Sequence, residues 1–178
     1  MTIPAERNIS LVGFMGTGKT SVGKAIGRQT SRNVIDVDQW IENRAHKRIR
    51  DIFEKDGEQR FRALESEAIA EISRLKGVVI TTGGGAVLDA GNVEALRKSG
   101  WLIALSASAD TIFERVKDSR HRPLLRGTAA SQIHPEIIRL LEERKSLYAT
   151  ADYEFRTDGL TPDEVAHLIL ETLEKESP

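Results

Sequence analysis

The chain has 178 residues, 39% of them hydrophobic and 30% charged, which is the composition of a globular domain with room for a sizeable core. Its 26 lysines and arginines are balanced by 27 aspartates and glutamates, so it lacks the basic excess of a dedicated nucleic-acid-binding protein. The absence of cysteine excludes disulfides, thiolate metal sites and a cysteine nucleophile.

The residues before Asn8 carry charge and no long apolar run, so we expect no secretory signal. No window approaches the roughly 18 apolar residues that a membrane helix needs. We therefore expect a cytoplasmic protein that binds neither membrane nor nucleic acid.

Short apolar strands alternate with helices along nearly the whole chain. In chain order we expect a strand at 9–12, a helix at 19–29, a strand at 34–37, helical pieces within 38–56, a helix at 58–75, a strand at 78–80, a short helix that includes 93–96, a strand at 101–105, a helix at 109–117, an irregular stretch at 118–131, a helix at 135–149, a strand at 153–156 and a last helix after Thr161. The residues from Thr161 to Glu164 read Thr-Pro-Asp-Glu, a capping box with proline in the first turn.

This alternation predicts an α/β fold of three layers, in which about five parallel strands are covered by helices on both faces. We expect residues 1–178 to form a single domain. Ligands of such sheets bind at the carboxyl ends of the strands. The chemically distinctive segments of this chain follow expected strands or lie in the helices beside them.

Residues 13–20 read Gly-Phe-Met-Gly-Thr-Gly-Lys-Thr and match the phosphate-loop pattern G-x-x-x-x-G-K-[ST] at every fixed position. Glycines let several backbone N–H groups converge on a phosphate, and the helix that follows adds its N-terminal dipole. Lys19 is expected to reach the β- and γ-phosphates of ATP, and the Thr20 hydroxyl to bind Mg²⁺. The predicted ATP contacts of this segment are Gly13, Gly16, Thr17, Gly18, Lys19, Thr20 and Ser21. The alternative is a plain glycine-rich turn before a helix. It would require the Lys-Thr pair, the spacing and the flanking strand and helix to occur together by chance.

Asp36-Val37-Asp38 ends the second expected strand. Alternate residues of a strand point the same way, so both carboxylates can face one site. One could then hold water around Mg²⁺, and the other could accept the proton of an attacking hydroxyl. The alternative is that the two aspartates only begin a helix, where carboxylates are favoured.

Three segments are candidates for binding the group that receives the phosphoryl. Gly83-Gly84-Gly85 follows the third expected strand and permits close approach of a ligand to the backbone, with a flexible turn as the alternative. Arg62 is either a ligand contact or half of a helix ion pair with Glu58 or Glu65. Arg144 is either a carboxylate clamp or a solvated helix charge.

Three other features of the sequence bear on the predicted phosphate and metal site. Thr81 and Thr82 stand at the end of the third strand, where phosphate-loop enzymes often have an aspartate that supports Mg²⁺. The stretch at 118–131 is rich in arginine and small residues, which suits a mobile lid that closes over phosphates and excludes water, with a solvated surface loop as the alternative. The four histidines show no metal-ligand spacing.

Together these segments resemble the shikimate kinase family over nearly the whole chain. The phosphate loop is shared with many nucleotide-binding proteins, whereas the combination of the other segments is specific. It comprises Asp36-x-Asp38 with Ile41-Glu42, Asp51-Ile52-Phe53, Gly57-Glu58, Phe61-Arg62-x-x-Glu65, Gly83-Gly84-Gly85, Arg122-Pro123-Leu124-Leu125 and Arg144-x-x-x-Tyr148. Family members often have Thr or Ser between the two aspartates, and the Val37 of this chain is expected to point away from the site.

The resemblance implies a P-loop NTPase fold with a substrate-binding helical region at about 38–65 and a mobile lid at about 118–131. It implies ATP-dependent phosphorylation of the 3-hydroxyl of shikimate with Mg²⁺ as cofactor, a step in the biosynthesis of chorismate and the aromatic amino acids. By resemblance, Asp38 binds the shikimate hydroxyls and is the candidate base, Arg62 and Arg144 clamp the carboxylate, and Gly83, Gly84 and Gly85 contact the same substrate.

On the nucleotide side, the resemblance makes Arg122 a catalytic residue that reaches the phosphates from the lid, as Lys19 does from the phosphate loop. The same resemblance implies that Arg115 lies beside the adenine. Asp36 supports Mg²⁺ through water, beside Thr20. We expect a monomer whose partners are ATP and shikimate.

The alternatives differ in the acceptor or in catalysis. Gluconate is also a hydroxylated acid, so Arg62 alone does not exclude a gluconate kinase, whereas a nucleoside acceptor would need more aromatic stacking than a chain with 5% aromatic residues offers. A regulatory module would bind ATP without transferring a phosphoryl group, but the combination of Lys19, Thr20, Asp36, Asp38 and Arg122 disfavours it. No N-K-x-D segment typical of guanine recognition occurs.

Overall fold

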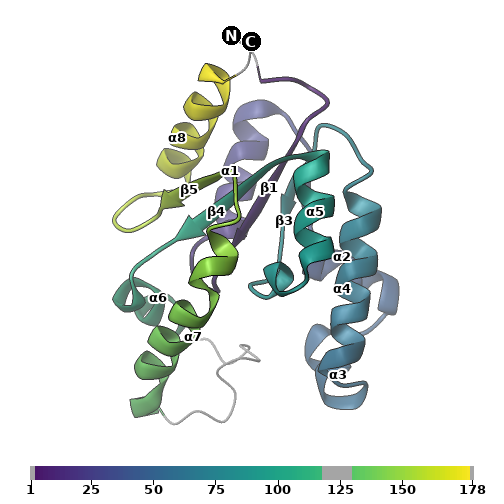
Figure 1. Ribbon diagram of the computed structural model, residues 1–178, viewed down its shortest axis with the longest axis vertical. Coiled ribbons are helices and arrows are strands. Elements are labelled where there is room, and N and C mark those ends of the chain that lie inside the picture. The colour runs from purple at the N-terminus through teal and green to yellow at the C-terminus, as the bar shows by residue number, and fades with distance from the viewer. Residues whose placement is uncertain (1–2, 118–129, 177–178) are drawn as a thin grey trace.

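The structure is a computed structural model that describes residues 3–117 and 130–176 (Figure 1). Of the predicted lid at 118–131 only residues 130 and 131 are described, and Arg122 lies outside the described residues. Within those ranges no helix is long and apolar enough to cross a membrane.

A sheet of five parallel strands forms the centre of the described structure, as predicted. The strands are β1 (Asn8–Gly13), β2 (Val34–Asp36), β3 (Val79–Thr81), β4 (Gly100–Ser106) and β5 (Tyr153–Arg156). Their spatial order is β2-β3-β1-β4-β5, so β1 is central and Leu11 lies opposite both Thr81 and Ile103. The segments that follow β3, β1 and β4 therefore meet at one edge of the sheet.

Helices cover both faces of this sheet (Figure 1). They are α1 (Lys19–Thr30), α2 (Val37–Ala45), α3 (Ile49–Lys55), α4 (Glu58–Ile72), α5 (Ala90–Ser99), α6 (Ala109–Val116), α7 (Ile133–Tyr148) and α8 (Pro162–Lys175), with single 3₁₀ turns η1 (Ala86–Leu88) and η3 (Ala130–Gln132). α1 and α8 pack on one face, and α2 to α5 pack on the other. The three-layer α/β architecture is confirmed.

The strands are apolar on both sides because each face of the sheet is buried. In β1, Ile9 and Leu11 belong to the core beneath α1 and α8, whereas Val12 belongs to the core beneath α4 and α5, as the two-residue period of a strand requires. A third cluster joins Phe14 and Met15 of the phosphate loop to apolar side chains of α6 and α7. This packing holds the phosphate loop against α6 and α7.

The boundary between β2 and α2 differs from the prediction. Val37, expected to end a strand, is the first residue of α2. The reason is that Asp36 caps this helix, its Oδ1 accepting a hydrogen bond from the Gln39 backbone N–H at 3.2 Å. The prediction that Asp36 and Asp38 share a strand is therefore wrong, although both side chains still reach the carboxyl edge of the sheet.

The short helix expected to include 93–96 is α5, which Asp89 caps by accepting from the backbone N–H groups of Gly91 and Asn92. One helix differs in length. The helix expected at 58–75 ends at Ile72, and Leu75 is 42% exposed. The remaining boundaries agree within the one or two residues by which helix and strand ends ordinarily vary.

Candidate active site

The phosphate loop lies between β1 and α1. Gly16 and Gly18 have φ angles of 75° and 94°, a left-handed region that disfavours side chains, and a Cβ on Gly13 would lie 2.2 Å from a carbonyl oxygen of β4. The ammonium of Lys19 donates to the carbonyl oxygens of Gly13 at 2.7 Å and Phe14 at 2.8 Å. The predicted strand–loop–helix setting is therefore present, with the lysine folded over the loop.

Asp36 joins the phosphate loop to β3 as well as capping α2. Its Oδ2 accepts hydrogen bonds from the Thr20 hydroxyl at 3.2 Å and from the Thr81 hydroxyl at 2.8 Å. Thr81, which stands where related enzymes often carry an aspartate, thus positions the carboxylate of Asp36. A hydroxyl and a carboxylate beside a phosphate loop suit Mg²⁺, which keeps several waters and takes other ligands from phosphates. In the described part of the chain no group of three or more His, Cys, Asp or Glu side chains forms a separate metal site.

Asp38 lies in the first turn of α2 and faces the turn at Gly83. Its Oδ1 is buried and has no hydrogen-bond partner among the described residues, and a Cβ on Gly83 would lie 3.2 Å from this oxygen. Burial raises the pKa of Asp38 to about 6, the charges of Asp36 and Glu65 add to the rise, and Lys19 opposes it. A buried acceptor without a donor is costly, so this oxygen is prepared for a donor that a ligand supplies.

Glu65 places a second carboxylate at the same point. Its side chain is only 1% exposed, and Oε2 accepts from Nη1 of Arg62 at 2.6 Å. The other oxygen, Oε1, is buried without a hydrogen-bond partner in the described structure and would lie 3.1 Å from a Cβ on Gly83. Burial raises the pKa of Glu65, while Arg62 lowers it. Asp38 and Glu65 therefore turn unsatisfied oxygens toward one small space beside Gly83.

Two guanidinium groups reach the glycine turn from different helices. On α4, the guanidinium of Arg62 lies so close to Gly85 that a Cβ there would be 2.5 Å from Nη1. On α7, Arg144 is 7% exposed and donates to the Gly84 carbonyl oxygen at 3.2 Å, and the Tyr148 hydroxyl donates to the same oxygen at 2.7 Å. The turn itself touches the phosphate loop, because a Cβ on Gly84 would lie 3.3 Å from the backbone nitrogen of Met15.

The ion-pair alternative for Arg62 is confirmed, and its role as a ligand contact stays a prediction. Arg62 pairs with Glu58 at 3.3 Å and with Glu65 at 2.6 Å, as the ion-pair alternative predicted, yet it also faces the glycine turn. A guanidinium carries five N–H donors, so two carboxylate partners do not exhaust it. The ion pairs hold the group in place.

The structure therefore gathers most of the predicted site residues at one edge of the sheet. Ser21 lies exposed in the first turn of α1, and Arg115 donates to the Gly16 carbonyl oxygen at 3.0 Å. Arg122 lies outside the described residues. The role of each residue stays a prediction.

Three side chains that contribute to the site were not among the predicted site residues. They are Glu65, Thr81 and Tyr148. Helical spacing could have identified two of them. Glu65 follows Arg62 by three positions and Tyr148 follows Arg144 by four, so each lies on the same helix face as a predicted site arginine. Thr81 gave no signal beyond its place at the end of a strand.

Comparison with known proteins bears on this arrangement. The family model described as shikimate kinase matches residues 15–174. The chain belongs to the shikimate kinase family. A shikimate kinase from Thermodesulfovibrio yellowstonii is 45% identical over 169 residues, which cover 95% of this chain and 96% of the relative. The structure of a shikimate kinase from Acinetobacter baumannii in complex with shikimate superimposes with a TM-score of 0.91 at 33% identity, covering 97% of this chain and 95% of that one.

The comparison also bears on the gluconate alternative. A gluconokinase from Sinorhizobium meliloti shares the fold, with a TM-score of 0.65, but only 20% identity over 98% of this chain and 94% of that one. It therefore supports the P-loop kinase fold and says nothing about the acceptor. Members of the shikimate kinase family use ATP as co-substrate and Mg²⁺ as metal, and Thr20 and Asp36 fit that metal as described above.

Proposed function

We propose that the chain transfers the γ-phosphoryl group of ATP to the 3-hydroxyl of shikimate through the residues gathered around Gly83–Gly85. One observation supports this most strongly. Two guanidiniums and two unsatisfied carboxylate oxygens face a glycine turn that touches the phosphate loop. Shikimate carries a carboxylate for the first pair and hydroxyl groups for the second.

The carboxylate is bound by Arg62 and Arg144. A guanidinium can bind a planar carboxylate through two parallel N–H···O bonds, which an ammonium group cannot do. Arg62 is held by Glu65 and Arg144 by Gly84, so both groups are oriented before the substrate arrives. This arrangement selects an acid over a neutral polyol.

The reacting hydroxyl donates a hydrogen bond to Oδ1 of Asp38. Its oxygen attacks the γ-phosphorus in line, the bond from that phosphorus to the bridging oxygen of ADP breaks, and Asp38 receives the hydroxyl proton. Negative charge builds on the phosphate oxygens as this happens. Lys19 neutralises part of it, and its position over the loop carbonyls places the ammonium there in advance.

Thr20 and Asp36 would hold Mg²⁺, the hydroxyl directly and the carboxylate through water. When bound, the ion supplies positive charge to the phosphates of ATP. Thr81 keeps the Asp36 carboxylate turned toward Thr20.

We also propose that residues 1–178 act as one kinase domain, with the substrate-binding region at 38–65, and that the chain works as a cytoplasmic monomer. The support for a single domain is that strands from both halves of the chain form one sheet. Charge balance supports small-molecule partners over nucleic acid.

The direct test is ADP release measured with Mg²⁺ and ATP in the presence of shikimate, of gluconate, or of no acceptor. We expect release that depends on shikimate. Release that depends on gluconate instead would keep the kinase and refute the acceptor. ATP binding without release in any of the three would favour a regulatory module.

Replacing Arg62 with alanine is expected to raise the KM for shikimate by about 10- to 100-fold, the effect of losing a charge-assisted hydrogen bond, with the KM for ATP little changed. Steady-state kinetics with each substrate varied in turn measures both constants. The matched control is Arg60→Ala on the same helix, whose side chain is 54% exposed and which should leave both constants within about twofold. Equal increases in the two KM values for Arg62→Ala would count against the clamp.

A further inference from the structure

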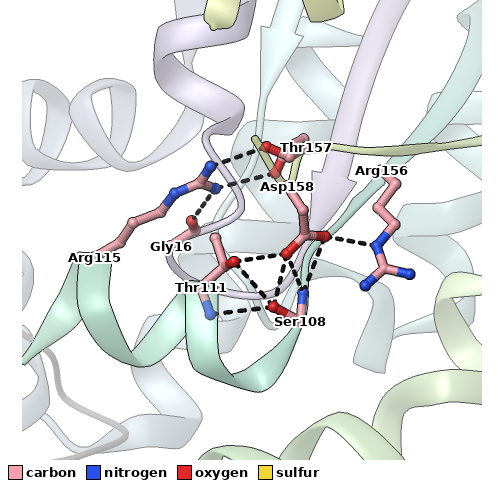
Figure 2. Close-up of polar contacts among 7 residues, drawn as sticks. All are labelled: Gly16, Ser108, Thr111, Arg115, Arg156, Thr157 and Asp158. Carbon is pink, nitrogen blue, oxygen red and sulfur yellow. Dashed lines mark hydrogen bonds and ion pairs between the residues drawn. The ribbon is translucent and has the colours of Figure 1, made fainter. Parts of the chain in front are cut away.

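A second polar cluster lies beside Gly16 of the phosphate loop (Figure 2). Asp38 and the glycine turn follow β2 and β3, whereas this cluster follows β4 and β5, and β1 with its loop lies between them. A nucleotide whose phosphates occupy residues 13–20 and whose γ-phosphate points toward Asp38 must direct its base to this opposite side. The cluster is therefore in the position of a nucleotide-base site.

Asp158, just beyond β5, is the centre of the cluster. Its Oδ1 accepts from the Ser108 backbone N–H at 2.9 Å, the Ser108 hydroxyl at 2.7 Å and the Thr111 hydroxyl at 2.6 Å. Its Oδ2 accepts from Nε of Arg156 at 2.7 Å. Ser108 is the N-cap of α6, so one carboxylate joins the first turn of that helix to the loop between β5 and α8.

The ionised form of Asp158 is strongly favoured. Burial alone would raise its pKa, but the hydrogen bonds from Thr111, Arg156 and Ser108 outweigh that effect and hold the pKa well below the usual range. The carboxylate is therefore ionised near neutral pH, where it accepts these hydrogen bonds and links α6 to the loop.

Arg115, two turns further along α6, is bound to the same loop. Its Nη1 donates to the Gly16 carbonyl oxygen and to the Thr157 hydroxyl, both at 3.0 Å, and its Nη2 donates to the Thr157 carbonyl oxygen at 3.0 Å. These bonds occupy the edge of the guanidinium and fix its plane, as Figure 2 shows. The residue is nevertheless exposed, so a ligand can meet the flat face of the group. Guanidinium faces stack on planar aromatic rings such as purines.

We propose that Asp158 is a positioning residue for the nucleotide base: by joining α6 to the β5–α8 loop it holds Thr157, and through Thr157 the plane of Arg115, beside the phosphate loop. Asp158 itself touches no nucleotide. Its hydrogen-bonding capacity is used within the protein, so it acts only through the neighbours it holds. This proposal rests on the proposed function, because placing the acceptor at Asp38 determines on which side of the phosphate loop the nucleotide base lies.

The variant Asp158→Ala removes the link. Arg115 and its loop must then be ordered when the nucleotide binds, and ordering a side chain of this kind weakens binding by about three- to tenfold. We expect the KM for ATP and the Kd for ADP to rise by about that factor, with the KM for shikimate and kcat within about twofold of wild type. The KM for shikimate is spared because Asp38, Arg62 and the glycine turn lie across β1 from the cluster.

Two further variants separate positioning from general stability. Asp158→Asn retains the Oδ1 acceptor for Ser108 and Thr111 and should restore most of the nucleotide affinity. Thr157→Val removes one acceptor of Arg115 while leaving Asp158 in place, and should weaken ADP binding although the link from α6 to the loop is intact. The matched control is Arg156→Ala, whose exposed side chain pairs with Asp158 but contributes nothing to Arg115, and ADP binding should not change.

Calorimetric titration of each purified protein with ADP measures the affinity without turnover, and steady-state kinetics supplies the KM values. Weaker ADP binding in Asp158→Ala and Thr157→Val with an unchanged KM for shikimate supports the proposal. Wild-type ADP affinity in Asp158→Ala together with a lower Tm overturns it, as does an equal rise in the KM for shikimate. If wild type shows no shikimate-dependent ADP release, the proposed function fails, yet the ADP titrations still decide this inference.

Discussion

Replacing Lys19 with alanine is expected to lower kcat by about 10²- to 10³-fold, the effect of removing one preorganised positive group from a developing anion. The residue is 8% exposed, and its ammonium is already held over the loop by the carbonyl oxygens of Gly13 and Phe14. Because phosphoryl transfer depends mainly on positioning and charge, little else in the described site can replace this group. Shikimate-dependent ADP release at saturating substrates measures the loss.

The control for this variant is Lys24→Ala, which removes an exposed lysine from the same helix, α1, and should leave kcat within about twofold. Circular dichroism and thermal unfolding establish that both variants retain the fold. Near-normal turnover in a folded Lys19→Ala protein would refute the role assigned to the phosphate loop.

Most of the fold could be predicted because it depends on signals that are local in sequence. The apolar strands of β1 and β4 are bounded by polar or glycine-rich segments, and the capping box at Thr161 and Glu164 is present as expected. At the boundary between β2 and α2, which was predicted wrongly, a side-chain cap decides where the helix begins. Asp36 accepts the backbone N–H group of Gln39, and no hydrophobic pattern reveals this contact.

The site could be predicted where a motif fixes its own geometry, as the phosphate loop does. The two aspartates show the limit of this reasoning. Their convergence on one site was expected from strand alternation, but the structure achieves it with Asp36 as a helix cap and Asp38 in the first turn of the helix. The expected alternative, that the carboxylates begin a helix, is thus also correct, and it is compatible with a role in the site.

Contacts between residues distant in the chain could not be predicted. Glu65 and Asp38 are separated by 27 positions, and only the folded chain shows that their free oxygens flank Gly83. Asp158 had no predicted role because its partners, Ser108 and Thr111, lie 50 and 47 positions away. Such contacts depend on how β4, β5 and α6 are arranged in three dimensions. The hydrophobic pattern and the secondary-structure propensities of the sequence do not determine that arrangement.

Replacing Asp38 with asparagine is expected to have opposite effects on activity and on stability. Activity should fall by about 10²-fold or more, because asparagine cannot accept the hydroxyl proton. Stability of the ligand-free protein should rise, because the carboxylate is buried beside Asp36 and Glu65 with one oxygen unsatisfied. Asparagine removes that charge and brings an N–H donor close to the free Oε1 of Glu65.

The pH dependence of this stability gain follows from the pKa of Asp38, which folding raises from 3.8 to about 6. The folded protein holds the proton more tightly than the unfolded chain does, so ionisation of Asp38 destabilises the fold. This penalty is absent well below the unfolded value, grows between the two values and is complete above the folded one. At about pH 7.5, without Mg²⁺ or nucleotide, we expect Asp38→Asn to be more stable by on the order of 2 kcal/mol, and at about pH 4 the difference should largely vanish.

Asp110→Asn is the matched control for this stability gain, since Asp110 occupies the same second position of its helix, α6, but its side chain is 89% exposed. A carboxylate near a helix N-terminus is normally favourable, so Asp110→Asn should destabilise the protein slightly. Chemical denaturation of the three proteins at both pH values measures the difference. An Asp38→Asn protein that is less stable than wild type at about pH 7.5 would show that the buried carboxylate is satisfied in solution. The same stability gain at both pH values would show that it arises from packing rather than from charge.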